Sequence, residues 1–177
     1  ALAGDTYGSK SVAIGREALV TQNFTTATDS YNTAVGYAAG QAVTTGIYNT
    51  FVGGAAGDST TTGQRNVGVG LQALDYNETG DASVAVGTNA LRKQNPATNT
   101  DMYNVAVGDE AGAEITTGVN NTIVGALAGD ALTTGHYNTA MGYAALSLDE
   151  DGDHSTAIGW GALSTQESDS AGQDIYN

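Results

Sequence analysis

The sequence predicts an all-β fold, a parallel β-solenoid of about nine coils of 17–21 residues each. Three observations predict it. A glycine recurs at a short and nearly constant spacing, an aliphatic residue directly precedes each of these glycines, and an alanine follows each one at the third position. We number positions in a coil from this repeat glycine, which is position 0. The repeat glycines are Gly15, Gly36, Gly53, Gly70, Gly87, Gly108, Gly125, Gly142 and Gly159, and the alanines at position +3 are Ala18, Ala39, Ala56, Ala73, Ala90, Ala111, Ala128, Ala145 and Ala162.

Positions −4 to −1 of each coil have the composition of a short strand. Position −1 is always aliphatic, and position −3 holds only Val or Thr. Residues two apart share one face of a strand, and β-branched residues suit a pleated surface. We therefore expect positions −3 and −1 to face the interior of the coil. Position −2 is small in most coils, and we expect it on the outer face, where another backbone, such as a neighbouring chain, can approach closely.

A second glycine recurs at position −7, and Asp29 and Asp101 take its place in two longer coils. Glycine adopts left-handed backbone geometry at little cost, and aspartate tolerates it. These residues predict a turn, so each coil is expected to hold two short strands and two turns. The −7 glycines are Gly8, Gly46, Gly63, Gly80, Gly118, Gly135 and Gly152.

A longer period of four coils is superimposed on the short one. It separates Gly15 from Gly87 and Gly87 from Gly159; position +4 alternates between Leu and Gly with this period, and Gln22, Gln94 and Gln166 are in register. We call four such coils a block. Residues 1–177 are thus one repeat array without an internal domain boundary. Because the sequence starts and stops within a coil, we expect it to be a segment of a longer fibre.

Composition excludes several classes of partner. The net charge is −14, with only five Lys and Arg residues, so nucleic acid and anionic membrane surfaces are poor partners. No stretch approaches the ~20 apolar residues of a membrane helix. The chain has no cysteine, and therefore no disulfide and no thiolate metal site.

No catalytic site or cofactor is predicted. His136 and His154 are the only histidines, they occupy neighbouring repeat positions, and no phosphate-binding loop of the Walker type occurs. The nearest approach to a metal site is the acidic turn containing Asp149, Asp151 and Asp153. Clustered carboxylates in a turn suit Ca²⁺, but the spacing is not that of an EF-hand. A solvated acidic turn is the preferred interpretation, and a calcium site is the alternative.

Two features are candidates for recognition. Tyrosines recur at position −5, where the favoured interpretation is stacking between coils and the alternative is a ligand platform. The longer coils carry insertions near residues 20–31, 92–103 and 164–176, which are expected to project from one side of the rod. Arg92 and Lys93 are the only adjacent basic pair and lie in the second insertion. Loops on a rigid scaffold often carry binding function.

The segment Ser11-Val12-Ala13-Ile14-Gly15-Arg16-Glu17-Ala18 resembles the head repeat of trimeric autotransporter adhesins. The form Asn32-Thr33-Ala34-Val35-Gly36, followed by Thr44-Thr45-Gly46, is similar to repeats in phage tail-fibre-like proteins. The resemblance covers essentially all nine coils. It implies a left-handed parallel β-roll, three chains packed as a homotrimer, and a place on a cell surface or a virion tail fibre. Small cores also gain stability from oligomerisation, which is consistent with a trimer.

The function expected from these observations is that of a structural and adhesive segment of an extracellular trimeric fibre, without enzymatic activity. One alternative is a module that binds glycan or matrix through its inserted loops or tyrosines. A further alternative is an ice-binding or cation-binding solenoid, because Thr and Asn recur in columns.

Overall fold

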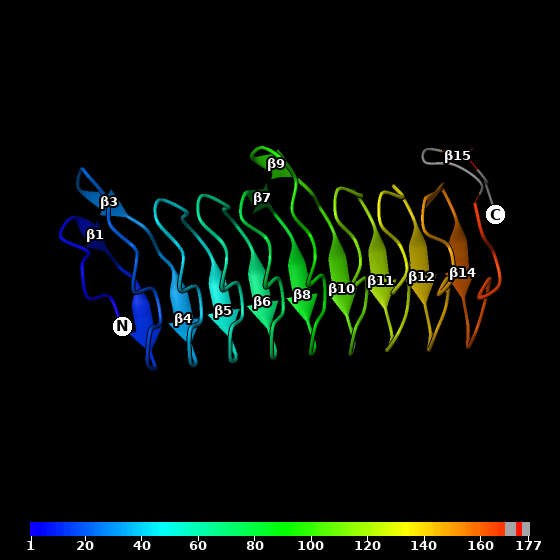
Figure 1. Cartoon of the computed structure of the whole chain (residues 1–177), viewed down its shortest axis with the longest axis horizontal. Coiled ribbons are helices and arrows are strands. Elements are labelled where there is room, and N and C mark those ends of the chain that lie inside the picture. The colour runs from blue at the N-terminus through cyan, green and yellow to red at the C-terminus, as the bar shows by residue number, and fades with distance from the viewer. Residues whose placement is uncertain (169–172, 175–177) are drawn as a thin grey trace.

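The computed structural model describes residues 1–168, 173 and 174, and these form a straight stack of coils without a helix (Figure 1). One strand of each coil joins a single parallel sheet with the order β14-β12-β11-β10-β8-β6-β5-β4-β2. Its members are β2 (Val12–Ile14), β4 (Thr33–Val35), β5 (Thr50–Val52), β6 (Val67–Val69), β8 (Val84–Val86), β10 (Val105–Val107), β11 (Thr122–Val124), β12 (Thr139–Met141) and β14 (Thr156–Ile158). The all-β solenoid of nine coils is therefore confirmed.

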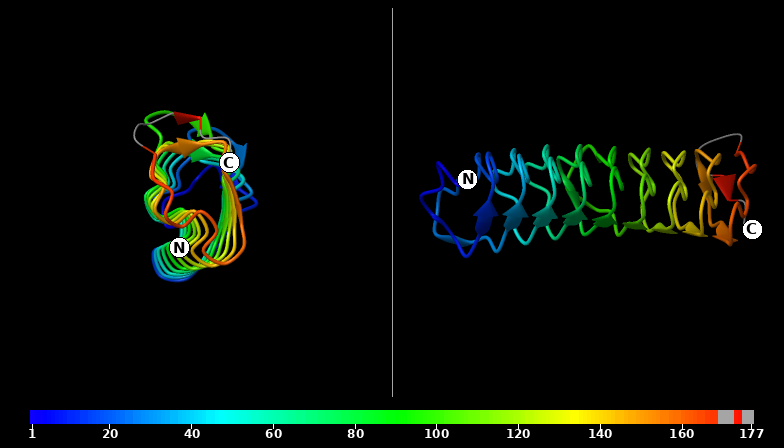
Figure 2. Two further views of the ribbon diagram at one scale, coloured as in Figure 1. Left: turned by 90° about the vertical axis from the view of Figure 1, so that its right-hand side faces the viewer. Right: turned by 90° about the horizontal axis from the view of Figure 1, so that it is seen from below.

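The coils stack in register. Ala34 of β4 pairs with Phe51 of β5, and Phe51 pairs in turn with Gly68 of β6, so each repeat position forms a column along the rod. Viewed along its length, the rod shows the coils superimposed on one another (Figure 2). The repeat glycine explains this closeness, because a Cβ on Gly70 would lie 2.4 Å from the carbonyl oxygen of Gly87.

In the described part of the chain, second strands occur only where a longer coil meets its neighbour. They form the pairs β1 (Gly8–Ser9) with β3 (Thr28–Asp29), β7 (Gly80–Asp81) with β9 (Thr100–Asp101), and β13 (Gly152–Asp153) with β15 (Gln173–Asp174). The prediction of two strands in every coil is thus wrong for the other described coils. There, isolated backbone bonds and side chains join the coils: the N–H of Arg65 donates to the carbonyl oxygen of Ile47 at 3.1 Å, and Asn32 Nδ2 donates to the carbonyl oxygen of Gly46 at 2.8 Å.

The predicted inner and outer faces of the strand are reversed. Position −2 is the buried one: Ala34, Phe51 and Ala85 have no exposed surface. Positions −3 and −1 face outward, and Ile14 and Ile158 are 59% and 65% exposed. In a three-residue strand, an inward middle residue leaves the other two on the opposite face. The small residues at −2 and +3 therefore line the coil's own interior and do not meet another chain.

The left-handed turn is also displaced from its predicted position. The glycines at −7 lack a positive φ, whereas the non-glycine residues at −5 have one, from 49° at Tyr31 to 61° at Tyr48. Glycine is required at this −7 position for lack of space, because a Cβ on Gly46 would lie 2.4 Å from the carbonyl oxygen of Gly63. Close approach between coils therefore selects glycine at −7.

The four-coil period arises from two ways of filling the interior. Coils with Leu at +4, such as Leu74, carry a polar residue at +7, here Asn77. Coils with Gly at +4 carry Val43, Thr60, Ile115 or Leu132 at +7 instead, all buried. Phe51 uses the space that glycine leaves, because a Cβ on Gly57 would lie 2.4 Å from its Cε1 atom. The period is therefore a packing pattern.

An asparagine ladder at position −4 connects the coils inside the rod. Asn121 is fully buried, its Nδ2 donates to the carbonyl oxygen of Gly135 at 2.8 Å, and its Oδ1 accepts from the backbone N–H of Asn138 at 2.9 Å. Where serine interrupts the ladder, the in-register glutamine restores it: Ser83 and Asn104 both donate to Gln94 Oε1 at 3.1 and 2.9 Å. The ladder thus continues through the coil in which asparagine is missing.

Candidate functional site

The outward face of the nine-stranded sheet is the largest candidate surface. We call positions −3 and −1 of its strands the sheet face. The face alternates Val or Thr at −3 with an aliphatic residue at −1, and Val12, Val107 and Met141 are 46%, 37% and 44% exposed. In the central strands these positions are half-buried, and a continuous row of partly exposed aliphatic side chains is typical of a surface that another protein covers.

A column of residues at position −5 runs along the rod beside β2 to β14. Its rings stack in the rod direction: Tyr31 lies parallel to Tyr48 at a centroid distance of 5.8 Å, and Tyr137 lies parallel to His154 at 5.0 Å. Lys10 Nζ lies 5.0 Å from the centre of the Tyr31 ring. Stacking between coils, the favoured interpretation of this column, is thus present in these pairs. Tyr176 lies outside the described residues.

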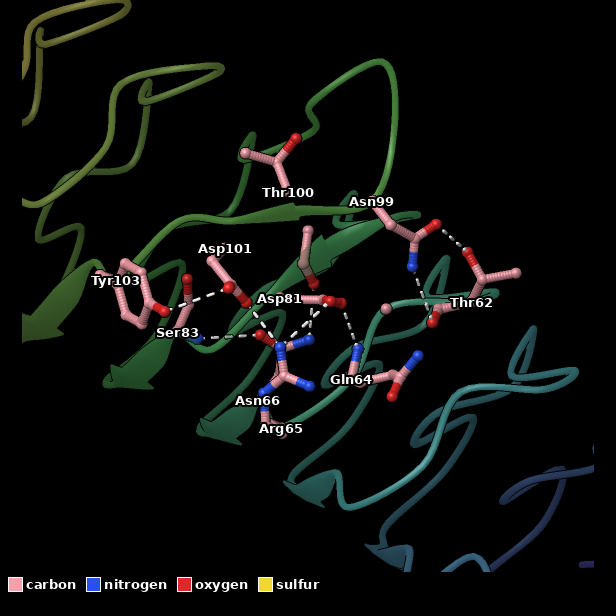
Figure 3. A network of polar contacts seen from close by, with 12 residues as sticks. Thr62, Gln64, Arg65, Asn66, Asp81, Ser83, Asn99, Thr100, Asp101 and Tyr103 are labelled. Atoms are coloured by element: carbon pink, nitrogen blue, oxygen red, sulfur yellow. Dashed lines mark hydrogen bonds and ion pairs between the residues drawn. The ribbon is translucent and has the colours of Figure 1, made fainter. Parts of the chain in front are cut away.

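The second insertion is fastened to the rod by a polar network (Figure 3). Arg65 Nη2 lies 2.5 Å from Asp101 Oδ1 and 3.4 Å from Asp81 Oδ2, so one guanidinium joins β9 and β7 to an adjacent coil. The Tyr103 hydroxyl donates to Asp101 Oδ2 at 3.1 Å. Nearby, Thr62 Oγ1 donates to Asn99 Oδ1 at 2.9 Å. The bond to Asp101 raises the pKa of Arg65, which keeps the guanidinium charged.

The first insertion uses a lysine in the equivalent role. Lys10 Nζ donates to Asp29 Oδ2 at 2.7 Å and to the Tyr31 hydroxyl at 2.9 Å. The bond from Lys10 lowers the pKa of the Asp29 carboxyl. We call the ion pairs Lys10–Asp29 and Arg65–Asp101 the clamps of the two insertions. Neither was predicted from the sequence. The signal was present, since aspartate stands at −7 in both longer coils where the others have glycine.

Arg92 and Lys93 lie in the stacked part of the coil, before the loop leaves it. Arg92 lies over the Tyr76 ring at 6.0 Å, and Lys93 Nζ lies 2.5 Å from Glu114 Oε2. Both side chains therefore make contacts within the rod. The exposed residues of this insertion are 97–99, Asp101 and Tyr103. The last insertion lies partly outside the described residues.

The three aspartates of the acidic turn point to different partners. Asp149 Oδ2 accepts from Gln166 Nε2 at 2.6 Å, and Asp151 Oδ1 accepts from the Thr134 hydroxyl at the same distance. Asp153 Oδ1 accepts from the backbone N–H of His136 at 2.6 Å. Within residues 1–168, 173 and 174, no group of three or more His, Cys, Asp and Glu residues is placed to hold a metal ion.

The two histidines take part in contacts between coils. His136 Nδ1 accepts from the backbone N–H of Val119 at 3.0 Å, and His154 stacks on Tyr137. Neither contact places a nucleophile beside a histidine in the manner of a catalytic pair. No helix long and apolar enough to cross a bilayer occurs in the described part of the chain.

Comparison with known proteins identifies the repeat itself. No match was found among the curated proteins or the solved structures. A family model does match: residues 134–162 correspond to two copies of the YadA head domain repeat. The matched segment contains the last two repeat glycines, Gly142 and Gly159, with strands β12 and β14. The resemblance to the head repeats of trimeric autotransporter adhesins is confirmed by this match of residues 134–162 to the YadA head domain repeat.

Proposed function

We propose that this chain is a structural and adhesive segment of an extracellular fibre, in which three copies pack through their sheet faces and no reaction is catalysed. The observation that carries the proposal is the outward sheet face. Val, Thr, Ile and Met side chains continue along nine strands, and in a single chain they are half-buried or exposed. YadA head repeats belong to trimeric adhesins, which are surface proteins, and this supports the same assembly here.

The interior of one chain explains why a partner is needed. Its core consists mainly of alanine, with one or two larger Leu, Phe, Ile or Val side chains in a coil. Burial of apolar surface stabilises by about 25 cal/mol per Å², so an alanine column contributes little in each coil. Covering the sheet face adds the apolar area that the narrow core lacks.

Light scattering on the purified chain tests the assembly. The expected mass is three times that of the 17.8 kDa chain. A folded monomer at micromolar concentration contradicts the proposal, because the sheet face would then be stable in water.

Adhesion is tested by shortening the projecting loop. Removing residues 96–99 reduces the longer coil to the length of the ordinary ones while keeping Gln94 and Asp101. The proposal of a structural rod predicts unchanged stability and mass, and adhesion to host cells or matrix that is also unchanged. Loss of adhesion from an intact trimer would instead favour the second candidate, a glycan-binding or matrix-binding module that uses its loops. The exposure of residues 97–99 is the observation that favours this candidate.

A further inference from the structure

Asp58 and Asp130 occupy the same position in successive four-coil blocks. Each follows the glycine at +4, Gly57 or Gly129, which has a φ of 59° or 52°. In both residues the Oδ1 atom is buried and has no hydrogen-bond partner. A buried carboxylate oxygen without a donor is unfavourable when the group is ionised. The same unfavourable arrangement therefore occurs twice.

The neighbours of Asp58 add negative charge. The backbone bond from Ser59 N to the carbonyl oxygen of Asp75, at 2.9 Å, places Asp75 beside Asp58 in the next coil. Asp75 is only 6% exposed, and Glu17 also repels Asp58. Gln41, at the same repeat position in the preceding coil, is neutral and bonds to Glu17 at 3.2 Å. Asp58 is thus half-buried with two further carboxyl groups near it, of which Glu17 is also paired with Arg16 at 3.0 Å.

The surroundings of Asp130 are similar. Asp130 lines a shallow cavity of about 190 Å³ together with Glu110, Glu114, Arg92 and Asn89. Glu110 and Glu114 repel it, while backbone hydrogen bonds from Asp130 and Ala131 to its carboxyl group act in the opposite direction. The next coil presents the neutral Ser147 at the matching position.

Arg92 lines the same cavity as Asp130, and its Nε atom is buried without a hydrogen-bond partner, but the contacts of the nearby cations are with other groups. Arg92 lies over Tyr76 and acts on Asp75, and Lys93 pairs with Glu114. Among the described residues, no Lys, Arg or His forms an ion pair with Asp58 or Asp130.

We propose that Asp58 and Asp130 make the rod acid-stabilised: uptake of a proton at these two carboxyl groups removes repulsion between coils and strengthens the stack. A neutral carboxyl group also gains an O–H donor that can bond to a neighbouring carboxylate.

The direction of titration agrees with this arrangement. Burial raises the pKa of Asp58, with repulsion from Asp75 and Glu17 adding to it, and burial likewise raises the pKa of Asp130. A folded pKa above the unfolded value, about 3.9, gives stability that is fully present below that value. It is lost as the pH rises through the folded pKa. The rod is therefore expected to weaken as the pH rises from about 4.

The test compares thermal unfolding of the full chain at pH 5 and pH 7.5, at equal ionic strength. The wild type is expected to have the higher Tm at pH 5. The double variant Asp58→Asn and Asp130→Asn should raise the Tm at pH 7.5 by about 2–4 °C per site and reduce the difference between the two pH values. Each single variant should give about half of this effect.

A matched control removes two exposed charges, with Asp109→Asn and Glu150→Gln. It has the same net charge as the double variant and should keep the wild-type dependence of Tm on pH. The proposal is overturned if the double variant keeps the wild-type pH dependence, if its Tm falls at pH 7.5, or if it does not fold. It is overturned equally if the control flattens the pH dependence as much as the double variant, because net charge alone would then explain the effect.

Discussion

At the residue scale, backbone contact between coils decides which positions must be glycine. The repeat glycines have φ values from 122° to 143°, and most would place a Cβ against the carbonyl oxygen of the next coil. At position −7, Gly46, Gly63, Gly118 and Gly135 meet the same obstacle with an ordinary φ. Position −5 is open enough for tyrosine, lysine or arginine, although its φ is positive throughout. The glycine pattern therefore reflects close contact between coils and, at the repeat glycines, a φ that other residues rarely adopt.

Gly70→Ala is expected to destabilise the rod by about 3 kcal/mol or more, because the φ of 134° is strained for alanine and the new Cβ lies 2.4 Å from Gly87 O. The midpoint of urea unfolding measures the change. Gly54→Ala is the matched control, since its nearest contact is the Leu71 Cδ1 atom at 3.3 Å and its φ is not positive. Equal losses in both variants would show that the contact with the next coil is unimportant.

A second change at this scale tests the asparagine ladder. Asn121→Ala leaves the N–H of Asn138 and the carbonyl oxygen of Gly135 without their side-chain partner, at a cost of about 2–4 kcal/mol. Calorimetry of the variant measures the loss. The exposed Asn23→Ala should change stability by less than about 0.5 kcal/mol. A ladder variant as stable as this control would mean that water replaces the lost bonds.

At the scale of elements, the three-residue strand is one part of a coil held mainly by its neighbours. Each inner strand of the central sheet pairs on both sides with identical register. Each coil is therefore stabilised mainly by its contacts with the two neighbouring coils. The two-residue strands form where an insertion changes the coil length. An ion pair holds the first insertion through Asp29 of β3, and another holds the second insertion through Asp101 of β9. These clamps sit at the surface, where screening by salt is effective.

Asp101→Asn removes the carboxylate that Arg65 binds, and we expect only a small loss of global stability, below about 1 kcal/mol, because the pair is half exposed. The local effect should be larger. Amides of residues 97–103 should exchange faster with solvent in the variant, and high salt should produce part of the same change in the wild type. Unchanged exchange in this loop would show that the Asn99 contacts with Thr62 suffice to hold it.

At the scale of the whole molecule, the rod has an apolar sheet face, and its acidic residues lie at other positions. Net charge of −14 keeps separate rods apart, while the sheet face lacks acidic residues at its −3 and −1 positions. Association through that face therefore avoids burying charge. Parallel strands in register keep the face straight over all nine coils, which suits packing of copies side by side (Figure 1).

Val86→Asp places a charge at the centre of the sheet face, and if the proposed trimer forms through that face, the variant is expected to be a monomer. Sedimentation equilibrium measures the mass, and circular dichroism shows whether the separated chain keeps its strands. Val84→Thr is the control, because threonine occupies the same −3 position in β4, β5, β11, β12 and β14. A trimer that persists in the Val86→Asp variant would exclude the sheet face as the interface.

The sequence by itself determined the period, the place of every strand in the central sheet, and the coils in which the packing changes. These follow from spacing, because a repeated position must form a column when coils stack. Only the tertiary structure decided which side of the strand is inside. Alternation with a period of two separates Ile14 from Ala13 but does not say which one faces the core, and the narrow coil admits alanine. The clamps around Arg65 likewise depend on three coils meeting in space, since Arg65 and Asp101 are 36 residues apart.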